Sequence, residues 1–228
     1  TPESTARAGT ANGMPTNRGT TIVHKSQTAK IETVLFDYGG VLAEEGFREG
    51  LMAIATDNGL SPTQFFEIAT EAVHDTGYLV GQAPESAYWD CLRQRAGIKG
   101  PDEALRREIL SRFVLRPCMV ELARRLRGQG KTVAILSDQT DWLDELDTRD
   151  DFFKEFDAVF NSYHIGMGKR NPDVFTFVAG RLGVPTPGIL FIDDNEGHIG
   201  RARSKGMQTI LYRDLESFMS QMAALGLA

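Results

Sequence analysis

The sequence predicts a three-layer α/β fold, in which helices cover both faces of a parallel sheet and a helical domain is inserted into the sheet-forming part. Two observations predict this architecture. From Ile31 onward, short apolar runs alternate with helical patterns, which is typical of a parallel sheet buried on both faces. In addition, nearly a hundred residues separate the first apolar run from the second, which leaves room for an inserted domain.

Composition limits the classes of protein to which the chain can belong. Of its 228 residues, 41% are hydrophobic and 25% are charged, which is enough to build a packed core. The formal net charge of -6 gives no support to a nucleic-acid partner. No apolar run approaches the ~18 residues of a membrane span. The two cysteines, Cys91 and Cys118, match no zinc-binding spacing and suit a reducing compartment, so we expect a cytoplasmic protein. From the charge and the apolar runs, we expect it to bind neither nucleic acid nor a membrane.

Residues 1–30 differ in composition from the rest of the chain. They are rich in Thr, Ser, Gly, Ala and Asn, and they contain four basic residues against the single acid Glu3. This segment therefore carries +3 and the remainder carries -9. Because it has too little apolar material for a core, we expect a disordered tail, native or left from a tag. A targeting segment is the weaker alternative, since arginine is sparse and no amphipathic face is visible.

The first expected strand, residues 34–36, is followed by the inserted helical domain at residues 46–115. The clearest helix start in this domain is Ser61-Pro62-Thr63-Gln64, which combines a capping box with proline at the first helical position. Four polar or aromatic residues of this domain could face a substrate from above, but most of them are expected to pack within the domain. The residues concerned are His74, Asp75, Tyr78 and Trp89.

The sheet-forming domain comprises residues 31–45 and 116–228. Its later expected strands are residues 133–136, 158–160, 189–192 and 209–212. Apolar residues spaced i, i+3, i+4, i+7 predict a helix over residues 119–126, which Gly128 is placed to end. Asn171 and Pro172 predict the N-cap and first-turn proline of a second helix, which ends before Gly183.

Carboxylates and a hydroxyl follow three of the expected strands. These groups are Asp37 after the first strand, Ser137-Asp138 after the second, and Asp193-Asp194 after the fourth. In an open parallel sheet, ligands bind beyond the carboxyl ends of the strands. Paired acids at an apolar strand end repel each other unless a cation intervenes, so Mg²⁺ bound through oxygen is the expected cofactor. Lys169 can offset the remaining negative charge.

These motifs resemble those of the haloacid dehalogenase-like hydrolase superfamily, whose members form an aspartyl-enzyme intermediate. The family's first motif is a strand that ends in a nucleophilic Asp and a Gly-rich turn, and residues 35–42, Leu-Phe-Asp-Tyr-Gly-Gly-Val-Leu, match it. Ser137 matches the second motif, Lys169 the third, and Asp193-Asp194 the fourth, in the right order and spacing. The inserted domain is similar to the small α-helical cap of the C1 type. The resemblance therefore implies a Rossmann-like core with such a cap.

The resemblance also implies a role for each residue. Asp37 would attack phosphorus and become a transient aspartyl phosphate. Mg²⁺ would be held by the Asp37 carboxylate, the Gly39 carbonyl and Asp194, with Asp193 behind them. The phosphoryl oxygens would be held by the Ser137 hydroxyl, the Lys169 ammonium and backbone amides near Tyr38, Gly39 and Asp138. The implied activity is Mg²⁺-dependent hydrolysis of a small phosphorylated metabolite, with a sugar phosphate slightly favoured.

Gly39 departs from the pattern of most phosphatases in this superfamily, which place a second Asp there as general acid and base. Such catalysis is typically worth ~10²- to 10⁴-fold. The Asp-x-Gly turn is similar to that of members that act on glucose 1-phosphate, so the change does not by itself mean inactivity. Two hypotheses remain open: Glu44 or Glu45 supplies the missing carboxylate, or the leaving oxygen needs little protonation, as an anomeric hydroxyl or an acyl group would.

Two alternative functions also remain open. Dehalogenation of 2-haloacids uses a related scaffold with an Asp nucleophile, but it needs no metal, and the pair Asp193-Asp194 argues against it. An inactive scaffold that binds a ligand or a protein is favoured only by Gly39. His164 and His198 are expected to be surface or loop residues. The substrate and the oligomeric state are not determined by the sequence.

Overall fold

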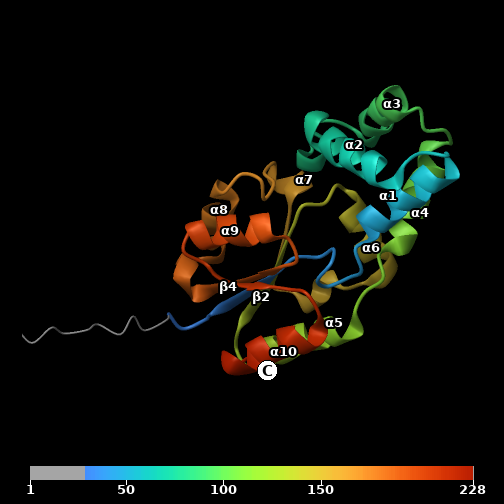
Figure 1. Ribbon diagram of the computed structural model, residues 1–228. Coiled ribbons are helices and arrows are strands. Elements are labelled where there is room, and N and C mark those ends of the chain that lie inside the picture. Colours follow the sequence, from blue (N-terminus) through green and yellow to red (C-terminus); the bar gives the residue numbers. More distant parts are fainter. Residues whose placement is uncertain (1–28, 228) are drawn as a thin grey trace, which may run out of the picture.

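Five parallel strands form one sheet in the order β3-β2-β1-β4-β5 (Figure 1). The computed structural model describes residues 29–227, so most of the expected N-terminal tail lies outside the described residues. Each expected strand is confirmed to within one residue at either end. The strands are β1 (Thr33–Phe36), β2 (Thr132–Ser137), β3 (Ala158–Asn161), β4 (Ile189–Asp193) and β5 (Gln208–Leu211).

The central strand β1 fixes which residues meet at the carboxyl edge of the sheet. Phe36 is in register with Ile135 of β2 and with Ile192 of β4. The Asp37 amide then donates to the Ile192 carbonyl at 2.9 Å, which extends the pairing by one residue. Because all strands run in the same direction, the residues that follow β1, β2 and β4 emerge side by side.

Helices cover both faces of the sheet. Val34 and Phe36 point into one apolar core, and Leu35 points into the other, as the alternation of side chains along a strand requires. The first core is closed by α5 (Pro117–Gly128), α6 (Trp142–Asp150) and α10 (Leu215–Ala224). The second is closed by α8 (Asp173–Leu182) and α9 (Glu196–Ser204), on the opposite side of the sheet (Figure 1). Three shorter helices, η2 (Phe153–Glu155), α7 (Ser162–Ile165) and η3 (Thr186–Gly188), lie in the connections.

The chain between β1 and β2 is helical. It forms α1 (Gly46–Asp57), α2 (Pro62–Asp75), η1 (Tyr78–Val80), α3 (Glu85–Ala96) and α4 (Asp102–Arg112). These helices group together at the upper right of Figure 1, above the carboxyl edge of the sheet. Trp142, at the start of α6, joins them to the sheet-forming part, because its ring stacks on Trp89 of α3 at 5.8 Å. We call α1–α4 and η1 the inserted helices.

Helix ends differ in detail from the expected ones. Pro62 begins α2 as expected, but the Ser61 side chain makes no capping hydrogen bond. Gly128 is the last residue of α5 rather than its stop. The Gly130 amide still donates to the Arg127 carbonyl at 2.9 Å. The chain then turns at Gly130, which adopts a left-handed φ of 78°. Helix α8 begins one residue later than expected, so Pro172 and not Asn171 is its N-cap; the Asp173 amide donates to Asn171 Oδ1 at 3.0 Å. Gly183 ends that helix as expected.

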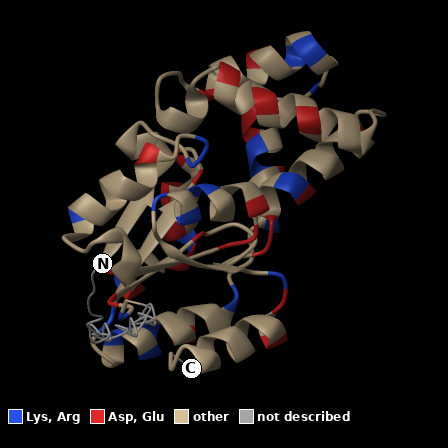
Figure 2. Cartoon of the chain, turned by 60° about the vertical axis from the view of Figure 1, so that its left-hand side comes forward, with Lys and Arg blue, Asp and Glu red and all other residues tan. Residues whose placement is uncertain are grey.

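Basic and acidic residues are interspersed along the inserted helices and the sheet-forming part (Figure 2). Several form ion pairs between neighbouring elements, such as Arg124 with Glu155 at 2.8 Å. Among the described helices, none is both long enough and apolar enough to cross a membrane.

We predict that Trp89→Ala lowers the free energy of unfolding by about 3–5 kcal/mol, because the substitution leaves a large cavity between α3 and α6. Trp89 is fully buried, whereas Val114 is 57% exposed, so Val114→Ala serves as the control and should change the free energy by less than about 0.5 kcal/mol. Urea unfolding followed by far-UV circular dichroism measures both. A loss below about 1 kcal/mol for Trp89→Ala would contradict the tight packing described above.

Candidate active site

Asp37 is held in one orientation at the carboxyl end of β1. Its side chain is nearly buried, at 7% exposure. The Ser137 hydroxyl donates to Asp37 Oδ1 at 3.0 Å, and the Tyr38 amide donates to the same oxygen at 2.7 Å. Lys169 Nζ lies 2.7 Å from the other oxygen, Oδ2. Three elements of the sheet-forming part therefore converge on one carboxylate, as the sequence predicts.

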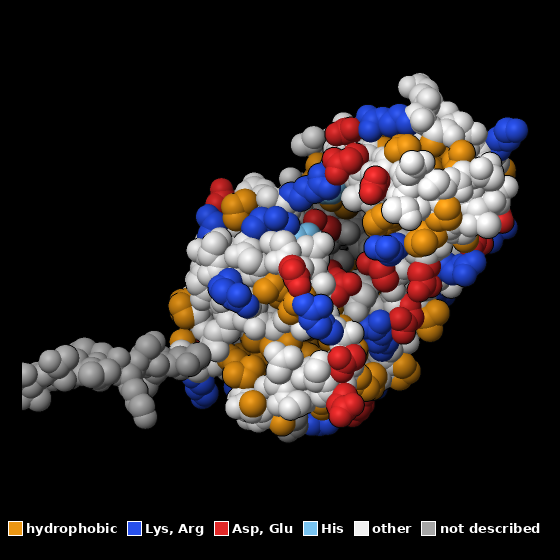
Figure 3. Space-filling model, viewed as in Figure 1, with side chains coloured by type: hydrophobic (Ala, Val, Ile, Leu, Met, Phe, Trp, Pro, Cys, Tyr) orange, Lys and Arg blue, Asp and Glu red, His pale blue; other side chains and the backbone are white. Residues whose placement is uncertain are grey.

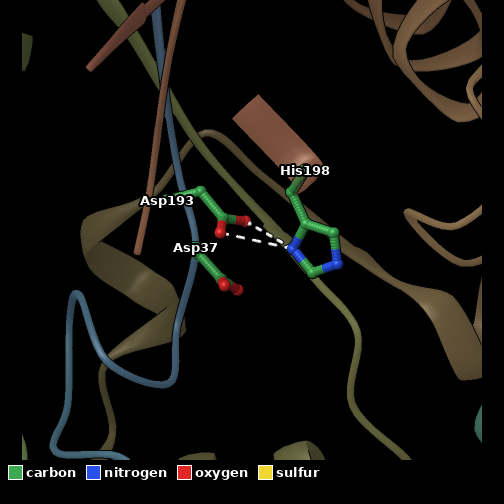
Figure 4. A group of neighbouring side chains, drawn as sticks. All are labelled: Asp37, Asp193 and His198. Carbon is green, nitrogen blue, oxygen red and sulfur yellow. Dashed lines mark hydrogen bonds and ion pairs between the residues drawn. The ribbon is translucent and has the colours of Figure 1, made fainter. Parts of the chain in front are cut away.

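Lys169 is shared between Asp37 and Asp193. Its Nζ lies 2.6 Å from Asp193 Oδ2, and the whole lysine is buried, with 0% exposure. Asp193 also accepts a hydrogen bond from the Asn195 amide at 2.7 Å, and His198 Nδ1 lies 3.1 Å from its Oδ2 (Figure 4). With both oxygens already engaged, Asp193 lies behind the site and orients Lys169 and His198.

Burial and charge give the two carboxylates opposite pKa shifts. Burial, only partly offset by Lys169, raises the pKa of Asp37 well above its usual value. Burial would also raise the pKa of Asp193, but Lys169 and His198 hold it well below its usual range. The pKa of Lys169 is raised because its two carboxylate partners outweigh the effect of burial. The ammonium is therefore charged at neutral pH.

The site has the charge and the donor atoms to hold a divalent cation. Asp37, Asp193 and Asp194 face the single ammonium of Lys169, and burial with the Asp193 charge raises the pKa of Asp194. Three carboxylates minus one ammonium leave two negative charges when all are ionised. Mg²⁺ would neutralise this excess and prefers such oxygen ligands. Among the described residues, the side-chain ligand atoms that lie within 4.8 Å of one another belong to Asp37, Asp193 and His198, a group that shares Asp37 with the expected ligands but does not include Asp194.

The carboxylate of Glu45 lies close to the space that a side chain at Gly39 would occupy. A Cβ atom at Gly39 would lie 3.8 Å from Glu45 Oε1, and its nearest neighbour would be Phe113 at 3.5 Å. Glu45 is the N-cap of α1, where its Oε1 accepts from the Arg48 amide at 3.5 Å. Burial, and next the charge of Asp194, raises the pKa of Glu45 to about 7. Glu45 is therefore near the position where the superfamily resemblance implies an acid.

Glu44 points away from this position. It is exposed and forms an ion pair with Arg116 at 2.8 Å. The hydrogen bond from Arg116 lowers the pKa of Glu44. The two glutamates that the sequence leaves as alternatives are thus separated by the structure: Glu45 lines the cavity described next, and Glu44 does not.

A cavity of about 260 Å³ lies between the carboxyl edge of the sheet and the inserted helices. Figure 3 shows the surface hollowed at this junction, with acidic and histidine side chains around the opening. Its floor includes six residues that the sequence predicts: Asp37, Gly39, Ser137, Asp138, Lys169 and Asp194. Asp138 also fixes the approach of Lys169, because its Oδ1 accepts from the Lys169 amide at 2.7 Å.

Tyr38 contributes only its backbone to this region. Its amide is engaged by Asp37, and its ring is buried between Phe113 and Phe152, 5.0 Å from the latter. Asp75, Tyr78 and Trp89 pack within the protein or pair at its surface, as expected; Asp75, for example, pairs with Arg95 at 2.8 Å.

Two histidines line the cavity, which differs from the expected surface or loop position of His198 and from the expected packing of His74 within the inserted domain. His198 was expected at the surface or in a loop, but it is half-buried against Asp193. The reason is local: Asn195 caps α9 by accepting from the His198 amide at 3.2 Å, and this turn places the ring over the end of β4. A sequence signal could have revealed the position of His198. This signal is a histidine three residues after an N-cap residue, where the N-cap itself follows a strand that ends in acidic residues. His74 of α2 also lines the cavity, whereas His164 is exposed and pairs with Asp144, as expected.

The fold is a parallel α/β sheet with an inserted helical segment, and a cavity lined by acidic residues lies at its carboxyl edge. A model of the haloacid dehalogenase-like hydrolase family matches residues 31–204, which is most of the chain. The chain belongs to this family, as the motifs predict.

One curated relative matches about half of the chain. Bifunctional epoxide hydrolase 2 of Rattus norvegicus is 31% identical over 127 residues, which are 53% of this chain and 22% of that protein. The chain thus spans about a fifth of the length of this curated relative.

Solved structures share the fold. A HAD family enzyme from Bacteroides thetaiotaomicron, in complex with magnesium and inorganic phosphate, is 22% identical with a TM-score of 0.63, over 82% of this chain and 98% of that one. L-2-haloacid dehalogenase from Xanthobacter autotrophicus, with chloropropionic acid covalently bound, is 19% identical with a TM-score of 0.60, over 87% and 84%.

A glycine beside the candidate metal ligands provides a test of the metal site. Gly40 has a left-handed φ of 76°, and a Cβ there would lie 2.2 Å from Asp194 Oδ2. We predict that Gly40→Ala displaces the Asp194 carboxylate and weakens Mg²⁺ binding about 10- to 100-fold. Gly97→Ala is the matched control, because Gly97 has a similar left-handed φ of 71°, does not line the cavity, and a Cβ there would meet nothing within 4 Å. Isothermal titration calorimetry with Mg²⁺ measures both, and equal affinities would exclude Asp194 as a ligand.

Proposed function

We propose that the chain is a Mg²⁺-dependent phosphatase that hydrolyses a small phosphorylated metabolite through an aspartyl phosphate on Asp37. The observation that carries this proposal is the buried carboxylate of Asp37, held by Ser137 and Lys169 on the floor of a cavity with an excess of negative charge. An anionic phosphate ester can approach this floor only when a cation offsets that charge. The shared fold with an enzyme that binds magnesium and inorganic phosphate supports the proposal.

In the proposed mechanism, Asp37 supplies the nucleophile and its neighbours hold the phosphoryl group. Asp37, the Gly39 carbonyl and Asp194 would hold Mg²⁺, which supplies charge neutralisation when bound. One Asp37 oxygen forms a bond to phosphorus while the bond from phosphorus to the leaving oxygen breaks. Ser137 and Lys169 stabilise charge on the transferred oxygens. Water then attacks the aspartyl phosphate, and inorganic phosphate leaves as the carboxylate of Asp37 is restored.

Glu45 is our candidate for the acid and base that Gly39 lacks. In the first step, a protonated Glu45 gives its proton to the leaving oxygen. In the second step, the resulting carboxylate takes a proton from the attacking water. A group that performs both tasks works best when its pKa is near the working pH. The pKa of about 7 for Glu45 meets that condition.

The first test is phosphate release from a panel of small phosphate esters, with Mg²⁺ and with EDTA. We predict that Asp37→Asn lowers kcat/KM by about 10³-fold or more, because the substitution removes the nucleophile. Asp57→Asn, at the exposed end of α1, is the control and should retain the native rate. Activity that survives EDTA or the Asp37→Asn substitution would contradict the proposal.

The same panel separates the other candidate functions. The shared fold with L-2-haloacid dehalogenase favours dehalogenation as the second candidate. Chloride release from 2-chloropropionate in EDTA, without phosphate release from any ester, would establish that function instead. Binding of beryllium fluoride with Mg²⁺ but no turnover of any ester would favour a scaffold or slow switch that binds without catalysis.

The second test compares the two glutamates. We predict that Glu45→Gln lowers kcat/KM for an alkyl phosphate about 10²- to 10⁴-fold, whereas Glu44→Gln has little effect. Because Glu45 must be protonated to donate, the native kcat/KM should fall as pH rises through about 7. Loss of this descending limb in Glu45→Gln is the expected signature. An unchanged pH profile in Glu45→Gln would exclude Glu45 as the acid.

A further inference from the structure

The wall of the cavity that faces the candidate nucleophile is mostly apolar. Its apolar side chains come from α1, α2, η1 and α6, and we call them the apolar wall: Phe47, Phe66, Val73, Leu79 and Trp142. Helix α2 contributes along a single face, since residues 66, 70, 73 and 74 follow the i, i+4, i+7, i+8 spacing. Whatever is esterified to the phosphate must lie against this wall.

Aromatic rings dominate the apolar wall. Phe47 lies between Phe66 and Trp142, with ring centroids 6.5 Å from each. The guanidinium of Arg48 stacks over Phe66 at 5.0 Å, which supports the outer side of that ring. Trp142 is in turn fixed by its stacking on Trp89. The wall is thus a set of supported rings, to which a flat or ring-shaped hydrocarbon group is complementary.

Few polar groups on the same side can bind hydroxyl groups. The Thr70 hydroxyl is buried without a hydrogen-bond partner among the described residues. Thr140 already accepts from the Trp142 amide at 3.3 Å, and Arg170 already pairs with Glu71 at 2.9 Å. His74 also lines the cavity, and burial lowers the pKa of its ring, which disfavours a charged contact with a ligand. A sugar would bury several hydroxyls here, and each one left unpaired would weaken its binding.

We propose that this cavity takes phosphate monoesters of compact apolar alcohols, with a ring-sized hydrocarbon group against the apolar wall, in preference to sugar phosphates. The inference rests on the proposed phosphatase function and names its substrate class. The volume of about 260 Å³ fits a phosphate with one such ring. The Thr70 hydroxyl leaves room for a single polar substituent on that ring. The preference for a sugar phosphate that the superfamily resemblance suggests is therefore replaced by an apolar ester.

Two esters of matched shape test this inference. Cyclohexylmethyl phosphate and glucose 6-phosphate both carry phosphate on a primary carbon attached to a six-membered ring, and they differ chiefly in the ring hydroxyls. We expect kcat/KM with Mg²⁺ to be at least tenfold higher for cyclohexylmethyl phosphate. Calorimetry with the Asp37→Asn variant should show the same order of affinity in the absence of turnover.

A variant of the apolar wall adds a second readout. Phe66→Ser should lower the ratio of the two kcat/KM values at least fivefold, mainly through KM for cyclohexylmethyl phosphate. Phe177→Ser is the matched control, because Phe177 is 37% exposed on α8 and does not line the cavity, so it should leave the ratio unchanged. An unchanged ratio in a folded Phe66→Ser variant would remove the apolar wall as the cause of selectivity.

The outcomes distinguish this inference from the function on which it rests. Turnover of glucose 6-phosphate that equals or exceeds that of cyclohexylmethyl phosphate would overturn the apolar preference and leave the phosphatase intact. Tighter binding of cyclohexylmethyl phosphate without hydrolysis of any ester by the native protein would overturn the phosphatase and support the apolar preference. Equal affinities of the Asp37→Asn variant for both esters would also overturn the preference.

Discussion

The ammonium group of Lys169, buried between Asp37 and Asp193, is the interaction on which the rest of the site depends. A buried ammonium is stable only with partners of opposite charge, and two adjacent carboxylates are stable only with a cation between them. Each group therefore fixes the others. The triad holds the candidate nucleophile still and leaves a local excess of negative charge. In the proposed function, that excess is the reason why Mg²⁺ would have to bind before an anionic ester could approach.

Most of the fold and the floor of the site could be predicted from the sequence, because both follow from short-range patterns. Apolar runs mark the strands, and parallel strands bring Asp37, Ser137 and Asp194 to a shared edge whatever their separation in sequence. The remaining features depend on orientation. The choice between Glu44 and Glu45 depends on which side chain Arg116 attracts, and no spacing rule reveals that partner. The composition of the cavity wall likewise depends on how α2 faces the sheet.

The absence of a carboxylate at Gly39 and the position of the Glu45 carboxylate are related. A carboxylate two residues after Asp37 would compete with Glu45 for the same space, since the two positions are separated by about a side chain's length. With glycine there, the acid that we propose comes from the start of α1 instead of from the strand turn. The chemistry of the site then depends on two parts of the chain, the edge of the sheet and the first inserted helix.

Glu45 is both the N-cap of α1 and a residue of the cavity lining, so the position of its carboxylate depends on the position of that helix. Its carboxylate travels with the first turn of α1, so a tilt of that helix by a few degrees would retract the proton donor while the nucleophile stays in place. An ester bound beneath displaced helices would meet an incomplete set of reactive groups. In the proposed mechanism, proton transfer therefore depends on the position of α1 as well as on the edge of the sheet.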